Sequence, residues 1–251
     1  MFCSFLTPDK INDLFAYADT VNYIQKCYTY IYYHNIILCS LIGKIRLVDR
    51  HSAEFAQVTR KFSNSWTKGS CPPVSCVHVF AITNPTLEQQ WTAYGQKLQH
   101  SVQTITEEHY HGTTLACNIT ISRSLCSDGN CGICGISCAG LDPQYIRKNI
   151  DFQRFGHGFY LAPNSSKCHD YTQGAYDFRA MLLCEVRPGN KYHLQTNSQK
   201  LKGPPQGYDS VYGLVGSKLN YPEIVVYNPH AVMPRYIIVY KKDGVEHPLA
   251  S

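Results

Sequence analysis

The clearest hydrophobic pattern in the first half of the chain is an alternating run followed by a helical one. Residues 76–82 read CVHVFAI, an alternation typical of a half-buried strand. Asn84-Pro85 then opens a segment that extends to about Gln99, and its large apolar residues recur every three or four positions. They are Leu87, Trp91, Tyr94 and Leu98. Because this spacing places them on one helical face, the pattern predicts a strand followed by an amphipathic helix.

The second half of the chain contains short apolar runs bounded by turn residues. Residues 180–186 (AMLLCEV) predict a buried strand that ends before Pro188-Gly189. Residues 223–227 (EIVVY) and 236–240 (YIIVY) predict two more strands, separated by the segment from Pro229 to Pro234. Helical patterns are few and lie early in the chain, so we expect an α+β fold.

Composition and charge narrow the class of protein. The chain has 251 residues, of which 44% are hydrophobic and 16% charged, enough for one large domain or two small ones with a sizeable core. The formal charge of +5 is mildly basic, but the densest basic spot is Lys241-Lys242, so there is no clear nucleic-acid-binding patch. The first residues do not resemble a secretory signal, and we expect an intracellular protein, cytoplasmic or nuclear, in which disulfides are rare.

Residues 28–48 raise the question of a membrane segment. The run is about as long as the ~20 apolar residues that cross a bilayer. However, it contains His34, Asn35, Lys44 and Arg46, whose side chains are costly at the bilayer centre. A buried helix or pair of strands is therefore favoured, and membrane contact stays open.

Three segments contain side chains suited to chemistry: residues 108–113 (EHYHGT), 154–171 (RFGHGFYLAPNSSKCHDY) and 221–227 (YPEIVVY). Taken singly, each has an ordinary structural explanation. A strand histidine is more often a satisfied core residue, tyrosines are usually core aromatics, and a Gly-x-Gly without a third glycine is a poor nucleotide-binding signal. Their order and spacing are more informative than any one of them.

In this order, the segments resemble the catalytic domain of the poly(ADP-ribose) polymerase family of ADP-ribosyltransferases. That family shows His-Gly-Ser/Thr, then Phe-Gly-x-Gly-(Ile/Phe)-Tyr, then Ser-Lys-x-x-x-Tyr, and then a Glu that opens a strand. The first three patterns end here at Thr113, Tyr160 and Tyr171, and the strand opens at Glu223. Residues 82–85 (ITNP) and 207–213 (GYDSVYG) also resemble family segments.

The resemblance covers about residues 53–243, which we expect to form one catalytic domain. Residues 1–52 would be an N-terminal segment of unknown role, and 244–251 a C-terminal tail. The implied fold has two packed antiparallel-rich sheets, few helices and a cleft for NAD. The implied reaction transfers ADP-ribose from NAD to a protein or nucleic-acid acceptor and releases nicotinamide, and a protein acceptor is favoured. We expect single transfers, because no element for chain elongation is recognisable. The alternatives are an NAD glycohydrolase and an inactive NAD-binding or zinc-stabilised interaction module.

The resemblance also implies a role for each matching residue. His111 would hold the adenosine ribose of NAD, and Gly112, followed by Thr113, would bind the nicotinamide carboxamide through its backbone. Tyr160 and Tyr171 would stack on the nicotinamide ring. Glu223 would complete a catalytic triad with His111 and Tyr160, because a carboxylate stabilises the positive charge that develops on the ribose.

Two features depart from the family pattern. Cys168 stands where the family usually has a serine whose hydroxyl bonds the carboxamide, and a thiol is a weaker donor. The segment from about Ala139 to Arg154, where the family has a loop over NAD, does not align. Chain length and acceptor choice therefore stay open.

Four cysteines follow His111 at short intervals. Cys117, Cys126, Cys131 and Cys134 read C-x8-C-x4-C-x2-C, and the final C-x2-C is the tight spacing usual in zinc sites. The sequence therefore predicts a structural zinc site, with Cys138 as a possible replacement ligand. Buried free cysteines remain an alternative, and a thioredoxin-like pair is less favoured because two further cysteines lie beside it.

Overall fold

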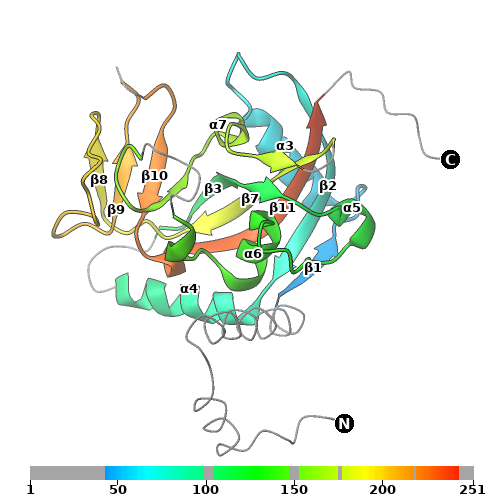
Figure 1. The fold of residues 1–251 in the computed structure, drawn as a ribbon, viewed down its shortest axis with the longest axis horizontal. Coiled ribbons are helices and arrows are strands. Elements are labelled where there is room, and N and C mark those ends of the chain that lie inside the picture. Colours follow the sequence, from blue (N-terminus) through cyan, green and yellow to red (C-terminus); the bar gives the residue numbers. More distant parts are fainter. Residues whose placement is uncertain (1–42, 99–104, 147–152, 175–176, 217–218, 243–251) are drawn as a thin grey trace, which may run out of the picture. The chain divides into compact units, whose positions relative to one another are not determined.

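Two antiparallel-rich sheets form the frame of the chain in this computed structural model, which describes residues 43–98, 105–146, 153–174, 177–216 and 219–242 (Figure 1). The larger sheet has five strands, all paired antiparallel, in the order β1-β2-β11-β7-β3. These are β1 Lys44–Leu47, β2 Val74–Thr83, β11 Val232–Lys242, β7 Arg179–Val186 and β3 Glu107–Gly112.

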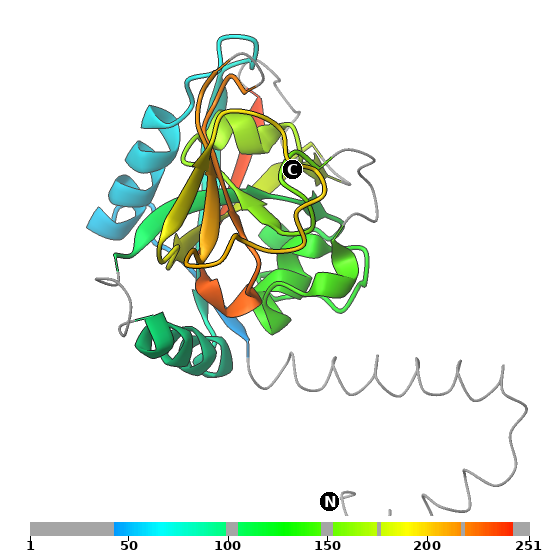
Figure 2. The same cartoon turned by 90° about the vertical axis from the view of Figure 1, so that its left-hand side faces the viewer.

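The smaller sheet has four strands in the order β5-β10-β9-β8, coloured green to orange in Figure 2. They are β5 Phe159–Leu161, β10 Glu223–Val226, β9 Ser210–Gly213 and β8 Lys191–Leu194. Only the β8–β9 pair is parallel. A third, two-stranded sheet pairs β4 Thr114–Leu115 with β6 Gln173–Gly174 in parallel.

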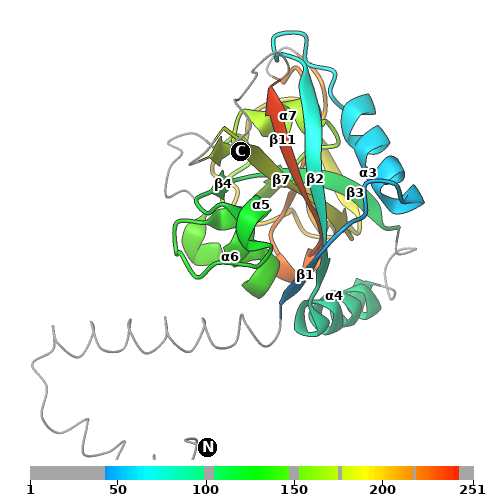
Figure 3. The same ribbon diagram turned by 90° about the vertical axis from the view of Figure 1, so that its right-hand side faces the viewer.

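The helices are short and lie outside the sheets. They are α3 Ala53–Asn64, α4 Pro85–Leu98, α5 Ile119–Ser122, α6 Gly132–Ala139 and α7 Ser165–His169, with 3-10 turns η1 Pro143–Tyr145 and η2 Pro229–Ala231. Helices α5 and α6 lie together with β4 on one side of the five-stranded sheet, and α3 lies on the other (Figure 3). The predicted α+β class is confirmed.

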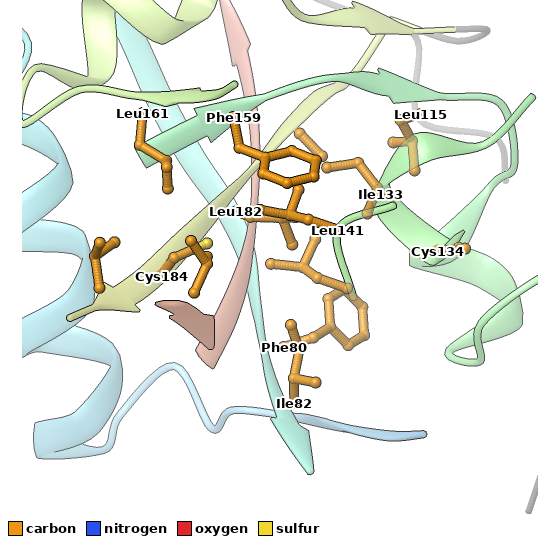
Figure 4. Close-up of a cluster of buried hydrophobic side chains, with 14 of the residues drawn as sticks. Phe80, Ile82, Leu115, Ile133, Cys134, Leu141, Phe159, Leu161, Leu182 and Cys184 are labelled. Carbon is orange, nitrogen blue, oxygen red and sulfur yellow. The ribbon is translucent and has the colours of Figure 1, made fainter. Parts of the chain in front are cut away.

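One apolar core joins the two sheets. Phe80 and Leu182 from the larger sheet belong to the same buried cluster as Leu161 and Ile224 from the smaller one. Ile133 of α6 packs into this cluster as well (Figure 4). Burial of such side chains stabilises the fold by roughly 1.5–3 kcal/mol each, so this shared core holds the two sheets and α6 together.

The sheet begins before the expected domain start at residue 53. Strand β1 pairs with β2 from Lys44 opposite Thr83 to Leu47 opposite Phe80, and Ile45 and Leu47 pack against the main core. Residues 44–47 therefore belong to the domain, since they extend its larger sheet by one edge strand and pack against its core. The ambiguous run 28–48 ends in this strand, while 28–42 lies outside the described residues. Among the helices that the structure describes, none combines the length and apolar character needed to cross a bilayer.

The predicted strands and the long helix are confirmed, with altered ends. Helix α4 buries Leu87, Trp91 and Leu98, as the spacing requires. Strand β11 begins at Val232, before the predicted residue 236, and so includes Pro234. The pairing with β7 shifts register between Pro234 and Tyr236, which accommodates a residue that has no N–H to donate.

Candidate active site

The two sheets meet where His111 and Tyr160 lie. Tyr110 on β3 and Ala162, just after β5, exchange backbone hydrogen bonds of 2.7 and 3.1 Å. Next to this bridge, His111 Nδ1 lies 2.9 Å from the carbonyl oxygen of Tyr160. Since a carbonyl only accepts, Nδ1 carries the hydrogen and Nε2 is the acceptor nitrogen of the ring. Burial lowers the pKa of His111, which favours this neutral form.

Gly112 lies against helix α7 so closely that a side chain would not fit. A Cβ atom on Gly112 would lie 2.0 Å from the carbonyl oxygen of Cys168 and 3.3 Å from Cγ2 of Thr172. The Cys168 thiol donates to the Tyr110 carbonyl at 3.1 Å, and burial raises its pKa to about 12. The His-Gly-Thr strand end and the Ser-Lys segment are therefore in direct contact, as the resemblance implies.

The Tyr160 side chain is held by hydrogen bonds at its hydroxyl and by packing of its ring. Its hydroxyl accepts from the Phe155 N–H and donates to the Gly156 carbonyl, each at 2.9 Å. Its ring packs with Phe155 and Val225. The hydroxyl thus closes the Phe-Gly-x-Gly turn, which holds the ring in one place.

Glu223 opens β10 as predicted and is only 6% exposed. Its carboxylate forms an ion pair with Lys167, whose Nζ also donates to the Tyr221 carbonyl at 3.0 Å. The Arg154 Nε atom lies 3.7 Å from the other carboxylate oxygen. Burial lowers the pKa of Lys167, and the charge of Glu223 opposes that shift. The buried negative charge of Glu223 is thus balanced by the positive charges of Lys167 and Arg154, as a buried charge requires.

Tyr171 lies just after helix α7 and is 51% exposed. Its pKa is raised first by burial and then by the charge of Glu223. Its side chain therefore has a free surface on which a flat ligand could stack.

Sequence reasoning missed the groups that anchor α7. The Ser166 hydroxyl accepts from the N–H groups of Thr67 and Lys68, both at 3.0 Å. Lys68 also forms a 2.5 Å ion pair with Asp170. These contacts fix the helix that presents Lys167 and Cys168. They join segments about 100 residues apart, so no local pattern could reveal them. Arg154 and Lys167 were visible inside the motif segment, but spacing alone did not place them on Glu223.

The four predicted cysteines form one group. One sulfur atom from each of Cys117, Cys126, Cys131 and Cys134 lies within 4.8 Å of the others. The Cys117 sulfur is 3.6 Å from that of Cys134 and 3.9 Å from that of Cys131. Four thiolates at ~2.3 Å from a tetrahedral zinc would be about 3.8 Å apart, so these positions fit that ion. Cys138 is disulfide-bonded and is not part of the group.

The segment 139–154, which the sequence did not align with the family, is described in part. It contains η1, capped by the Asp142 side chain on the Gln144 N–H at 2.9 Å. Residues 147–152 lie outside the described residues.

The chain is similar in sequence to known ADP-ribosyltransferases. The poly(ADP-ribose) polymerase catalytic domain family matches residues 52–218. The human protein mono-ADP-ribosyltransferase PARP3 is 25% identical over 172 residues, which are 67% of this chain and 27% of that protein. The human protein mono-ADP-ribosyltransferase PARP4 is 32% identical over 124 residues, which are 45% of this chain and 7% of that protein.

The chain thus spans about a quarter or less of the length of these two relatives. The family match, by contrast, covers most of the domain described above. The order of the motifs, the sheets and the family match lead to one conclusion: the chain belongs to the poly(ADP-ribose) polymerase catalytic domain family.

Proposed function

We propose that this chain transfers single ADP-ribose units from NAD to a protein acceptor and releases nicotinamide. The supporting observation is the convergence of His111, Tyr160 and Glu223 on three neighbouring strands. His111 on β3 bonds the Tyr160 carbonyl on β5, and β5 pairs with β10, which Glu223 opens. Residues far apart in the chain are thereby gathered at one edge of the junction between the sheets.

The proposed roles follow from the chemistry of each group. Gly112 would bind the nicotinamide carboxamide through its backbone, and Thr113 follows it in the same wall of the pocket. Tyr160 and Tyr171 would hold the nicotinamide ring, and the acceptor nitrogen of His111 would take a hydrogen bond from the adenosine ribose. Cys168, whose thiol already donates to Tyr110, would line the carboxamide end.

Glu223 would act on the reacting bond. The bond between nicotinamide and the ribose carbon breaks, and nicotinamide leaves with the electron pair. The ribose carbon then bears positive charge, which the Glu223 carboxylate stabilises. A nucleophilic acceptor side chain attacks that carbon, and its proton passes to the carboxylate or to water. Lys167 would keep the Glu223 carboxylate directed toward the ribose, since its ammonium group forms an ion pair with one of the two carboxylate oxygens.

A protein acceptor and single transfers are supported by the relatives, whose names describe protein mono-ADP-ribosyltransferases. The test is incubation of the purified chain and a cell lysate with NAD, followed by mass spectrometry and measurement of nicotinamide release. Single ADP-ribose groups on protein would support the proposal. Nicotinamide release with only free ADP-ribose would instead indicate a glycohydrolase, and absence of release would indicate a binding module.

We also propose that the cysteine group, Cys117, Cys126, Cys131 and Cys134, holds one structural zinc ion. The support is the donor set and the sulfur–sulfur distances, which match tetrahedral coordination. Four protein thiolates leave no position for water, so the ion would stabilise the fold and take no part in the reaction. Elemental analysis of the purified chain should find about one zinc per molecule, as a single four-thiolate site requires.

A further inference from the structure

The cysteine group touches the predicted NAD-binding motif through Gly132. Gly132 is the first residue of α6 and directly follows Cys131. A Cβ atom on Gly132 would lie 2.2 Å from Oγ1, 3.1 Å from Cγ2 and 3.2 Å from Cβ of Thr113. Rotation of the threonine side chain about its Cα–Cβ bond would move Oγ1 and Cγ2, but the contact with its Cβ at 3.2 Å would remain. Thr113 is therefore pressed against the backbone at the start of α6.

A second connection runs through the backbone. The Ala116 N–H donates to the Cys131 sulfur at 3.4 Å, and Cys117 belongs to the cysteine group. Between Thr113 and Ala116 lies β4, which pairs with β6, and β6 begins two residues after Tyr171. The cysteine group thus adjoins the segment that follows His-Gly-Thr, and β4 connects it to the strand that follows Tyr171.

The start of α6 is held by a backbone hydrogen bond from the Cys131 N–H to the Asp128 carbonyl at 2.9 Å, but no side chain caps it. The helix reads GICGISCA, its two glycines are poor helix formers, and the Cys131 side chain makes no capping hydrogen bond. The other end is anchored, because the Asn84 side chain donates to the Cys138 carbonyl at 2.6 Å. The position of Gly132 is therefore set by its neighbours Cys131 and Cys134 and by burial of Ile133.

We infer that Gly132 is a positioning residue, through which the metal-bound cysteine group holds Thr113 in place and so sets the affinity for NAD. This inference rests on the proposed function, because Thr113 matters only if NAD binds beside it. It adds that loss of the metal would weaken NAD binding through the contact between Gly132 and Thr113, while the sheets stay folded.

The test compares Gly132→Ala with Gly135→Ala. Both glycines lie on α6, and neither has a positive φ, but a Cβ at position 135 would meet nothing within 4 Å. We expect Gly132→Ala to retain the zinc and the melting temperature of Gly135→Ala. Its KM for NAD should rise about tenfold or more with kcat within about twofold, because small misplacements of binding groups are costly. A merely structural role would move the melting temperature and leave KM unchanged.

A second measurement covers the case in which Gly132→Ala does not fold. Wild-type chain is treated with a zinc chelator, and NAD binding is measured by calorimetry while circular dichroism follows the sheets. Weaker NAD binding with intact sheets supports the inference. If the Gly132→Ala variant folds, chelation should weaken its NAD binding less than that of wild type. The substitution and the loss of zinc would act through the same contact between Gly132 and Thr113, so their effects should not add.

The two proposals fail in different ways. If untreated wild-type chain does not bind NAD, the proposed function is wrong. If wild type binds NAD and contains zinc, yet both Gly132→Ala and chelated protein bind NAD as tightly as wild type, the role of Gly132 is overturned and the proposed function stands.

Discussion

Two regions meet at residues 111–113, and they are held in place by different means. On one side, His111, Tyr160 and Glu223 lie on strands whose backbones are paired along defined registers. On the other side, residues 116–139 contain two short helices and no paired strand, and four sulfur atoms gather at their centre. The first region is built from backbone hydrogen bonds, and the second depends on side chains.

The difference has a physical consequence. Strand pairing is satisfied within the chain and needs no ligand, so the triad region should keep its shape whenever the sheets are folded. Four closely packed thiols form few good hydrogen bonds with one another, so the cysteine region should keep its shape only with a metal bound. Changes in the first region should therefore affect the reaction, and changes in the second should affect stability and NAD affinity.

The largest effect is expected for Glu223→Gln. Glutamine retains the size of the side chain but removes the charge that would stabilise the transition state. Turnover should fall about 100- to 1,000-fold, the scale of one preorganised electrostatic group, with NAD still bound. The measurement is nicotinamide release at saturating NAD together with NAD binding by calorimetry.

Glu108→Gln is the matched control for this change. Glu108 lies on β3, and its partly exposed carboxylate pairs with Lys61 of α3 at 2.6 Å and with no residue of the triad. Such a surface pair contributes about 0–1 kcal/mol, so turnover should be unaffected. Wild-type nicotinamide release by Glu223→Gln would refute the triad assignment and would point to another catalytic acid.

The next largest effect is expected when Cys131 and Cys134 are replaced together by serine. The variant should lose its zinc and at least ~2 kcal/mol of unfolding free energy, because loss of a metal is among the changes with large effects on stability. Turnover per molecule that remains folded and saturated with NAD should change little. Denaturation curves, elemental analysis and kinetics at saturating NAD measure the three quantities.

The control is a chain with Cys71 and Cys76 replaced by serine, since these free cysteines lie outside the cysteine group. It removes the same number of thiols and should retain its zinc. A metal-free wild-type protein that is as stable as the zinc-loaded one would rule out a structural metal.

A smaller effect is expected for Tyr171→Ala. Removal of a stacking face should weaken NAD binding by about 1 kcal/mol, the usual contribution of an aromatic pair. Tyr171→Phe keeps the ring and should bind NAD like wild type. Calorimetry with NAD and with nicotinamide distinguishes the two variants. Unchanged binding by the alanine variant would mean that the Ser-Lys segment is wrongly matched to the family.

The same contrast explains what the sequence could and could not predict. The strand that contains residues 76–82 and the buried face of α4 follow from periodic side chains, which report local structure directly. The cysteine group was predicted from spacing, because a C-x2-C turn is itself local. Strand β1 was expected only as one alternative within residues 28–48, because four residues that alternate intermediate with exposed positions give no clear strand pattern.

Contacts between distant segments escaped prediction for another reason. The bonds of Ser166 to Thr67 and Lys68 and the approach of Gly132 to Thr113 depend on how loops meet after folding. The spacing of hydrophobic and polar residues along the chain carries no information about such contacts. The motif order implied which residues surround NAD, but the two cations on Glu223 became visible only in three dimensions.

The smallest expected effect is a pH dependence of stability that originates in His111. Burial lowers the pKa of this histidine below its usual value of 6.5. At pH values between 6.5 and the lower pKa that His111 has in the folded state, the unfolded chain binds more protons than the folded chain. Stability should therefore fall as the pH drops below about 6.5, by less than ~1.4 kcal/mol per pH unit for one group. Denaturant unfolding of wild type and His111→Gln at pH 7.5, 6.5 and 5.5 measures the slope.

Comparing the two slopes isolates His111 from the other groups that titrate. His78 is a half-buried histidine with a lowered pKa, and zinc thiolates bind protons as the pH falls, but both act equally in the two proteins. Glu107, whose pKa is lowered to about 2 chiefly by its hydrogen bond with His109, loses its contribution only below its usual value of 4.5. The His111→Gln slope should therefore be shallower than that of wild type. Identical slopes would mean that His111 is not held neutral at the junction of the sheets, and the tautomer assigned from its bond to Tyr160 would then be wrong.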